Sequence, residues 1–121
     1  MKILIVDDAK AMRMSVRRTL RQAGIEATHI DEACNGKEAL ESIRNSKPDL
    51  VLCDWNMPEM TGIELLQELQ KNGPKVRFGF VTTEGTPKMV QTAIASGALF
   101  LITKPFTPES FRSEITSALE R

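Results

Sequence analysis

Five polar residues stand at the ends of short apolar runs of the chain, and their types suit chemistry on a phosphoryl group. They are Asp7 and Asp8 after one run, Asp54 after a second, Thr82 at the end of a third and Lys104 after a fourth. Three carboxylates held close together repel one another unless a cation or a proton offsets their charge. Such an oxygen-rich set suits Mg2+, a hard cation that binds through carboxylates together with phosphate oxygens.

The lysine and the threonine complete this interpretation. Phosphoryl transfer needs positive charge and hydrogen-bond donors around the oxygens of the group in flight, and Lys104 and the hydroxyl of Thr82 could supply them. Asp54 would then be the nucleophile that forms an aspartyl phosphate. The residue types therefore predict Mg2+-dependent phosphoryl transfer onto Asp54.

The apolar runs predict five short strands, and the segments between them have the spacing of amphipathic helices. We expect strands at 3–6, roughly 27–33, 50–53, 77–82 and 99–103. Strict alternation of strand and helix predicts a parallel sheet with right-handed crossovers and helices on both faces. The second strand contains His29, Asp31 and Glu32, which is typical of an edge. The predicted fold is α/β and flavodoxin-like, a doubly wound five-stranded sheet in the order 2-1-3-4-5 with five helices.

Helix boundaries have their own signals. Thr61 with Glu64 fits a capping box, and Asn35 with Glu38 resembles one. Thr86-Pro87 and Thr107-Pro108 are two further predicted helix starts. The predicted helix ends are Gly24, Gly73-Pro74 and Gly97.

A doubly wound sheet also predicts where the polar residues meet. Ligands bind beyond the carboxyl ends of the strands, at the crevice where the strand order reverses. All five residues follow or close strands, so we expect them to converge at that end of the sheet.

Composition narrows the class of protein. The chain has 121 residues, 41% of them hydrophobic and 26% charged, which predicts one globular domain over 1–121 without room for an output domain. A formal net charge of zero predicts neither nucleic acid nor an anionic membrane as partner. The first apolar run is too short for a signal peptide or a membrane span, so a cytoplasmic location is expected. Cys34 and Cys53 are expected to be buried, reduced thiols.

The ordered set of motifs resembles one family, the receiver domains of response regulators, and most of all the single-domain chemotaxis receivers of the CheY type. The resemblance covers essentially the whole chain. Its motifs are Val6-Asp7-Asp8, Met12-Arg13, Asp54-Trp55-Asn56-Met57-Pro58, Thr61-Gly62, Val81-Thr82 and Lys104-Pro105-Phe106.

The resemblance implies a role for each matching residue. Asp54 matches the phosphoacceptor, and Asp8 and Asp54 match side-chain Mg2+ ligands, with the backbone carbonyl of Asn56 as a third. Asp7 matches the carboxylate that holds the metal through water, and Lys104 matches the lysine that contacts the phosphoryl group.

The switch and output positions implied by the resemblance are Thr82, Leu101 and Pro105. Thr82 matches the hydroxyl that bonds a phosphate oxygen after transfer, and Lys104-Pro105 is expected to be a cis peptide. Leu101 stands where receivers of this type usually have an aromatic residue. Our hypothesis is that the surface of the fourth helix and fifth strand responds through Thr82 and backbone movement alone.

The function implied is a switch rather than a conventional enzyme. Such a receiver takes its phosphoryl group from a histidine kinase, hydrolyses it itself, and alters its affinity for a downstream protein, possibly a flagellar switch component. We expect a monomer.

Alternative functions are a single-domain phosphorelay shuttle, a phosphate sink, a constitutive binding module, or a small-molecule Mg2+-dependent phosphatase, for which no substrate-binding insertion is visible. A flavodoxin-like cofactor binder is disfavoured, since Asp-Asp-Ala-Lys after the first strand would repel a bound phosphate.

Two features leave alternatives open. Lys10, Arg13, Arg17 and Arg21 share one helix face, which could dock an acidic partner, although a solvated face is the default. Trp55 directly follows Asp54 and could be a gate over the site or a surface aromatic residue.

Overall fold

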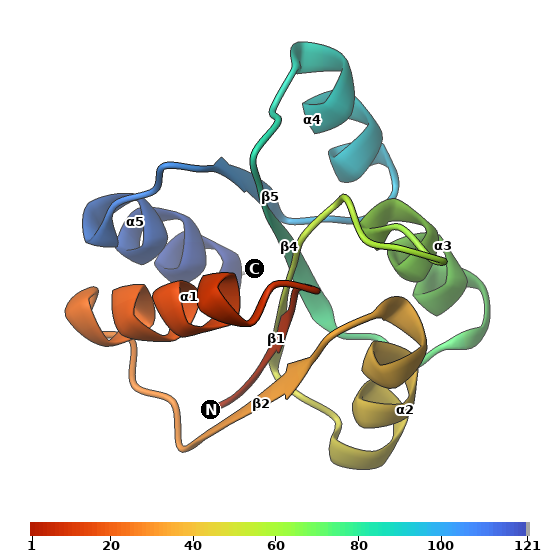
Figure 1. Ribbon diagram of the computed structural model, residues 1–121, viewed down its shortest axis with the longest axis horizontal. Coiled ribbons are helices and arrows are strands. Elements are labelled where there is room, and N and C mark those ends of the chain that lie inside the picture. Colours follow the sequence, from red (N-terminus) through yellow and green to blue (C-terminus); the bar gives the residue numbers. More distant parts are fainter. Residues whose placement is uncertain (121) are drawn as a thin grey trace.

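The computed structural model describes residues 1–120, which form three layers with a parallel sheet in the middle (Figure 1). The strands are β1 (Lys2–Val6), β2 (His29–Ala33), β3 (Leu50–Cys53), β4 (Arg77–Thr82) and β5 (Phe100–Thr103). The helices are α1 (Lys10–Gln22), α2 (Gly36–Ser46), α3 (Gly62–Asn72), α4 (Pro87–Ala95) and α5 (Pro108–Leu119). The strand order is β2-β1-β3-β4-β5, with every pair parallel, which confirms the predicted flavodoxin-like fold.

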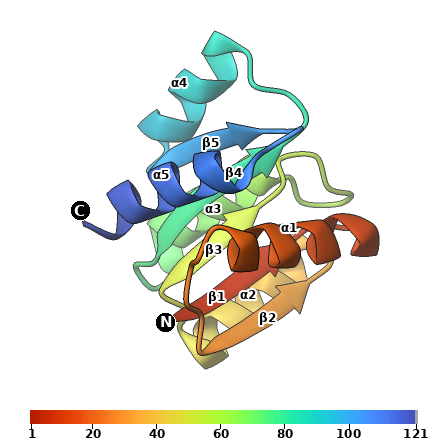
Figure 2. The same cartoon turned by 90° about the vertical axis from the view of Figure 1, so that its left-hand side faces the viewer.

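The helices divide between the two faces of the sheet. Helices α1 and α5 lie on one face, in front of the sheet in Figure 2, and α2, α3 and α4 lie on the other. Successive side chains of a strand point to opposite faces. Leu4 and Val6 of β1 therefore belong to the hydrophobic cluster beneath α2 and α3, whereas Ile3 and Ile5 belong to the cluster beneath α1 and α5. The two clusters exclude water from both faces of the central strands and so hold the ends of these strands in fixed positions.

The strand predictions agree with the structure except at some ends. The bounds of β3 and β4 are those expected, and β2 is an edge strand as its polar residues indicate. However, β2 begins at His29 rather than near Ala27, since the chain must first turn from the end of α1 back to the sheet edge. Thr28 makes this turn against the chain start, because its N–H donates to the carbonyl oxygen of Met1 (2.8 Å).

Capping side chains begin the helices as predicted at Thr61, Thr86 and Thr107. Thr61 forms the complete capping box with Glu64. The Asn35 side chain accepts the N–H of Glu38 (2.8 Å). The Glu38 carboxylate instead accepts the N–H of Cys34 (3.1 Å), so this cap is only half of a capping box.

The cysteines differ from each other. Cys53 is buried, as expected, and burial raises the pKa of its thiol well above the usual range. Cys34 is only partly buried, a correction to the prediction, because it follows the edge strand and its Sγ donates to Glu38 (3.2 Å).

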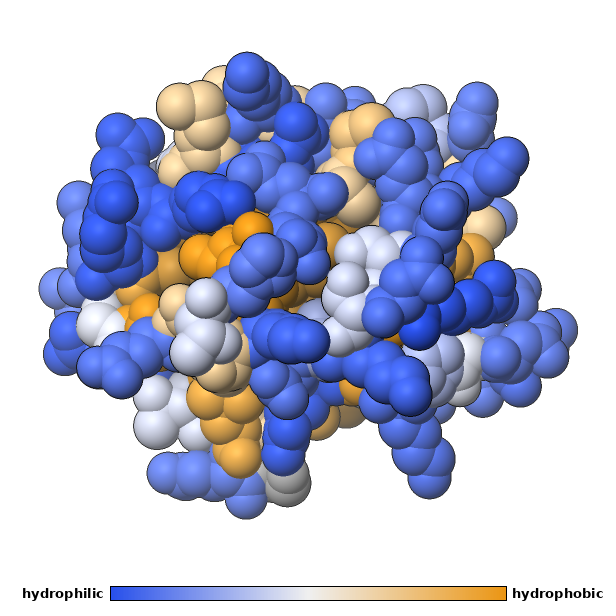
Figure 3. Space-filling model, turned by 90° about the horizontal axis from the view of Figure 1, so that it is seen from below, coloured by the Kyte–Doolittle hydropathy of each residue, from blue (hydrophilic) through white to orange (hydrophobic). Residues whose placement is uncertain are grey.

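No helix within residues 1–120 is both long and apolar enough to cross a membrane. The face seen from below Figure 1 is mostly hydrophilic, with small separate hydrophobic areas (Figure 3).

Candidate functional site

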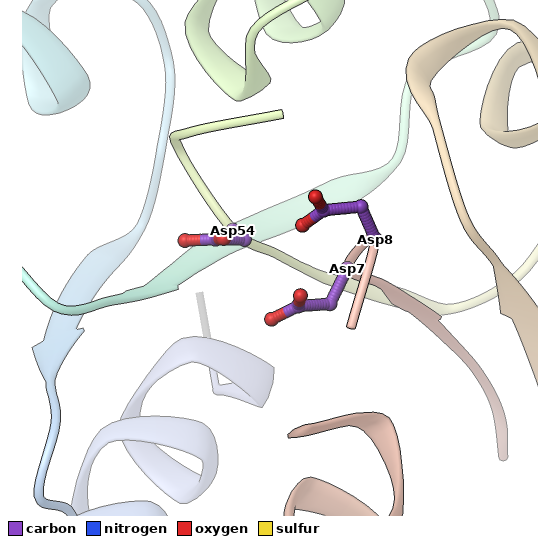
Figure 4. Close-up of side chains that lie close together, drawn as sticks. All are labelled: Asp7, Asp8 and Asp54. Carbon is purple, nitrogen blue, oxygen red and sulfur yellow. The ribbon is translucent and has the colours of Figure 1, made fainter. Parts of the chain in front are cut away.

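Three carboxylates meet beyond the carboxyl ends of β1 and β3. One oxygen from each of Asp7, Asp8 and Asp54 lies within 4.8 Å of the others. Figure 4 shows the side chains of Asp7 and Asp8 beside that of Asp54. The two strands are neighbours in the sheet, and the order of the chain reverses between them. The structure thus brings these residues together at the crevice where a doubly wound sheet binds its ligands.

Asp7 is only 4% exposed and makes hydrogen bonds on several sides. Its N–H donates to the carbonyl oxygen of Ala33 (3.1 Å), which extends the pairing of β1 with β2. Its Oδ1 accepts the N–H of Ala9 (2.9 Å), and its Oδ2 accepts Lys104 Nζ (3.3 Å). Asp7 therefore links the β1–α1 loop with the end of β5.

Asp54 directly follows β3 and is 8% exposed. Its N–H donates to the carbonyl oxygen of Val6 (2.9 Å), and its Oδ1 accepts the N–H of Trp55 (2.9 Å). Burial raises the pKa of Asp54 above its ordinary value, and the Lys104 ammonium, 3.9 Å from Oδ1, opposes that rise. The negative charge of Asp7 raises the same pKa further. The site thus holds a carboxylate whose charge is incompletely compensated by the protein.

Thr82 ends β4 at the same edge and is fully buried. Its Oγ1 has no hydrogen-bond partner among residues 1–120. The hydroxyl is near enough to Asp54 to favour the ionised carboxylate, but its geometry is not that of a hydrogen bond. A buried hydroxyl without a partner is rare in folded proteins, and at this position it is free to donate to a ligand.

Asp8 and Asn56 lie in the loops after β1 and β3 and are exposed. The donor set that the sequence predicts for Mg2+ therefore combines two buried carboxylates, one exposed carboxylate and a loop residue. Hard oxygen ligands and surplus negative charge fit Mg2+, which usually binds with few protein ligands and keeps several waters.

Comparison with known proteins assigns the family. Residues 3–116 match the profile of the response regulator receiver domain. The chain belongs to this family. The chemotaxis protein CheY of Thermotoga maritima is 40% identical to this receiver over 120 residues, which are 99% of this chain and 95% of that protein. CheY of Bacillus subtilis is 39% identical over 118 residues, with 98% and 97% covered.

Solved structures give the same assignment. Chemotaxis protein CheY4 of Vibrio cholerae is 34% identical to this receiver, with a TM-score of 0.81 and 97% of each chain covered. A CheY-like receiver domain protein of Methanospirillum hungatei is 31% identical, with a TM-score of 0.83 over 98% of this chain and 93% of that one. The chain is therefore a receiver of the CheY type in both sequence and fold.

Two predicted switch positions of this receiver, Leu101 and Pro105, lie on β5 and directly after Lys104. Leu101 is half-buried and packs against the core beneath α2 and α3. Pro105 is exposed and follows a cis peptide, as expected. The β4–α4 loop crosses β5 closely, because a Cβ on Gly85 would lie 2.3 Å from Thr103 Cγ2 and 3.2 Å from Leu101 Cδ2.

Two residues of the receiver site gain a role that sequence reasoning did not give them. A Cβ on Gly62 would lie 2.2 Å from the carbonyl oxygen of Asp54, so only glycine lets α3 approach Asp54 this closely. The Thr61-Gly62 step at a helix start was the available signal. Arg13 does not belong to a solvated face, as the default interpretation had it, because its guanidinium donates to the carbonyl oxygen of Asp7 (2.6 Å).

Trp55 also has a defined place in the receiver. Its ring is half-buried and packs on Phe80 of β4, with ring centroids 4.9 Å apart. Trp55 is therefore anchored on the core beside Asp54 rather than a freely exposed loop aromatic.

Proposed function

We propose that this receiver is a switch of a two-component system that accepts a phosphoryl group from a histidine kinase onto Asp54. The observation that supports it is the meeting of three carboxylates with the Lys104 ammonium and the unpaired Thr82 hydroxyl. These are an oxygen nucleophile, a cation and a donor, which are the groups that phosphoryl transfer uses.

Mg2+ fits this site and is part of the proposal. The Asp8 and Asp54 carboxylates and the Asn56 carbonyl would hold the ion, and Asp7 would act through a bound water. Bound Mg2+ supplies positive charge that offsets the carboxylates and the phosphoryl oxygens. The grouping of the three aspartates within 4.8 Å supports this role, since such a group is costly unless a cation joins it.

The transfer step requires one oxygen nucleophile. An Asp54 carboxylate oxygen attacks the phosphorus of the kinase phosphohistidine, the P–O bond forms and the P–N bond breaks. The electron pair of that bond returns to the imidazole nitrogen, which takes up a proton. Lys104 is placed to stabilise the oxygens of the group in flight. Hydrolysis later releases inorganic phosphate when a water oxygen attacks phosphorus and Asp54 is the leaving group.

Switching would begin at Thr82. A phosphoryl oxygen on Asp54 offers an acceptor to the Thr82 hydroxyl, and the new bond would draw the end of β4 inward. The β4–α4 loop would then move over β5, where Gly85 lies against Leu101 and Thr103. Since Leu101 is aliphatic and already packed, the output surface of α4 and β5, including Pro105, would respond through Thr82 and the backbone.

The biological setting that we propose is chemotaxis. Support comes from the CheY proteins of Thermotoga maritima and Bacillus subtilis, which match this chain over nearly their whole length. A downstream protein, for example a flagellar switch component, would bind the phosphorylated form more tightly.

Intact mass after incubation with acetyl phosphate and Mg2+ tests the central step. We expect one added phosphoryl group on the wild type and on Asp31→Asn, a control aspartate on β2, and none on Asp54→Asn. Removal of Mg2+ by a chelator should abolish the addition. An unmodified wild type, or an equally modified Asp54→Asn variant, would disprove the proposal.

A further inference from the structure

One guanidinium ties the start of α1 to both strands beside it. Arg13 Nη1 donates to the carbonyl oxygen of Asp7 at the end of β1 (2.6 Å). Arg13 Nε donates to Glu32 Oε1 on β2 (2.7 Å). The side chain is only 14% exposed, although it belongs to a helix that is mostly solvated on this side. The planar fork of arginine can make two such bonds at once, whereas a lysine ammonium has no fixed fork.

Glu32 orients the Arg13 guanidinium through this hydrogen bond. Its second oxygen, Oε2, accepts Arg17 Nε (3.1 Å) and forms an ion pair with Arg17 Nη2 (3.0 Å), so one carboxylate binds two arginines one turn apart on α1. The bond from Arg13 holds the pKa of Glu32 below its ordinary value. Arg17 continues to the carbonyl oxygen of Ile30 on β2 (3.1 Å). The two arginines thus share Glu32 and differ in their backbone partner, and only Arg13 reaches the acidic pair.

The bond to Asp7 acts on Asp8 through the peptide group. The Asp7 carbonyl oxygen and the Asp8 nitrogen belong to one planar unit, so a bond that fixes the oxygen also fixes the plane. Asp8 is exposed, and packing does little to restrain it. The direction of its carboxylate toward Asp54 therefore depends on the backbone of the β1–α1 loop.

We propose that Arg13 is a positioning residue that, anchored by Glu32, fixes the Asp7–Asp8 peptide so that both carboxylates face Asp54. This inference rests on the proposed Mg2+ site. It predicts that the geometry of the fork, beyond its charge, sets the affinity for Mg2+. Groups that support the ligands of a metal typically change its affinity by about 10- to 100-fold when they are lost.

Charge and geometry act in opposite directions here, so the variant must keep the charge. A neutral residue at position 13 would remove a cation that repels Mg2+ and would also release the peptide. Arg13→Lys retains the positive charge and loses the fork. Arg17→Lys is the matched control, since it disturbs the same Glu32 carboxylate without touching Asp7.

The experiment measures the free energy of unfolding by urea at a series of Mg2+ concentrations, with far-ultraviolet circular dichroism as the signal. The stabilisation by a bound ligand rises with its concentration relative to the dissociation constant, which the series therefore yields without any phosphorylation. We expect Arg13→Lys to weaken Mg2+ binding about tenfold, the lower end of the range for supporting groups. Arg17→Lys should bind like the wild type.

The outcomes separate this inference from the proposal on which it rests. A wild type that Mg2+ does not stabilise overturns the proposed metal site itself. A wild type that binds Mg2+ while Arg13→Lys binds equally well overturns only the role of Arg13, and so does equal weakening in both lysine variants. Should Arg13→Lys fail to fold, Glu32→Asp serves instead, because it keeps the charge of the carboxylate and the guanidinium while shortening the anchor by one methylene. Weaker Mg2+ binding supports the inference, and unchanged binding overturns it.

Discussion

At the scale of the residue, Asp54 is an acid that the protein holds in an unfavourable environment for its charge. Burial raises its pKa, and the nearby Asp7 adds to the effect. An acid whose pKa is raised by folding takes up protons more readily in the native state, so its contribution to stability falls as the pH rises. The ionised Asp54 thus lowers the stability of the protein at neutral pH.

Asp54→Asn should therefore stabilise the protein at neutral pH. We expect the free energy of unfolding to rise by about 1–2 kcal/mol, a typical effect of relieving a poorly compensated buried polar group. The difference from the wild type should shrink as the pH falls through the raised pKa of Asp54 and vanish once the carboxyl is protonated in both folded and unfolded chains. Urea unfolding across acidic and neutral pH measures this. Lower stability of the variant at neutral pH would contradict the prediction.

The Thr82 hydroxyl gives a second prediction at this scale. Thr82→Val keeps the shape of the side chain and removes an oxygen without a partner in the described part of the chain. Replacement of an unsatisfied buried polar group by an apolar one of the same shape is neutral or stabilising, here by up to about 1 kcal/mol. Urea unfolding without Mg2+ or phosphodonor measures the effect, with Thr19→Val as the control, because Thr19 Oγ1 donates to the Ser15 carbonyl oxygen (2.8 Å). A larger loss in Thr82→Val than in Thr19→Val would mean that the Thr82 hydroxyl is paired.

The site was predictable residue by residue only in part. The positions of Asp7, Asp54 and Thr82 follow from strand ends, because the carboxyl ends of parallel strands meet at one edge. The bond from Arg13 to the Asp7 carbonyl did not follow, since helical spacing placed Arg13 with Arg17 on a solvated face. A side chain that curls back to the backbone leaves no periodic pattern in the sequence.

At the scale of the element, α3 begins at the site, and its start is fixed by the Thr61 capping box. The N–H of Gly62 donates to the carbonyl oxygen of Trp55 (2.8 Å), so the helix start is joined to the loop that follows Asp54. Helix α5 begins with a second capping box at Thr107. Both caps use a threonine at the N-cap, with Glu64 as its partner in α3 and Ser110 in α5, and they differ in location.

Thr61→Ala and Thr107→Ala form a matched pair. Each should lower the free energy of unfolding by about 1 kcal/mol, the usual cost of a lost cap. Only Thr61→Ala should also slow phosphorylation by acetyl phosphate, because only this helix start abuts the loop of Asp54. Rates from intact mass at saturating Mg2+ provide the comparison, and equal rates in the two variants would show that the α3 cap has no influence on the acceptor.

The order of the elements was easier to predict from sequence than their ends. Buried strands such as β3 and β4 are continuous apolar runs bounded by polar residues, so their limits are visible. The polar edge strand β2 has no such limits, because Ala27 and Thr28 continue its pattern while the chain is still turning. The half capping box at Asn35 shows the same limit, since residue spacing does not specify which N–H the Glu38 carboxylate accepts.

At the scale of the whole molecule, the two halves of the sheet should respond differently to phosphorylation. Lys104 N–H donates to the carbonyl oxygen of Thr82 (2.8 Å), so a backbone hydrogen bond joins the end of β4 to the residue after β5. The β4–α4 loop also packs against β5 at Gly85. On the other side, Glu32 holds β2 against α1 through two arginines. Movement that starts at Thr82 would therefore spread toward α4 and β5 and leave β2 in place.

Hydrogen exchange with and without beryllium fluoride, a mimic of the phosphoryl group, tests this asymmetry. With Mg2+ present, we expect altered amide protection from the end of β4 through α4 and β5, and unchanged protection in β2 and α2. Asp54→Asn should show no change with the mimic and is the control. Altered protection confined to β2 and α2 would contradict a route that begins at Thr82.

The packing of Trp55 on Phe80 has a practical consequence. The chain contains one tryptophan and no tyrosine, so near-ultraviolet emission comes almost wholly from a single indole. Trp55 directly follows Asp54 in the chain, and its backbone N–H donates to the Asp54 carboxylate. The molecule thus has a built-in optical reporter, in which a change of light intensity on mixing with metal or phosphodonor records events at one place, without any label.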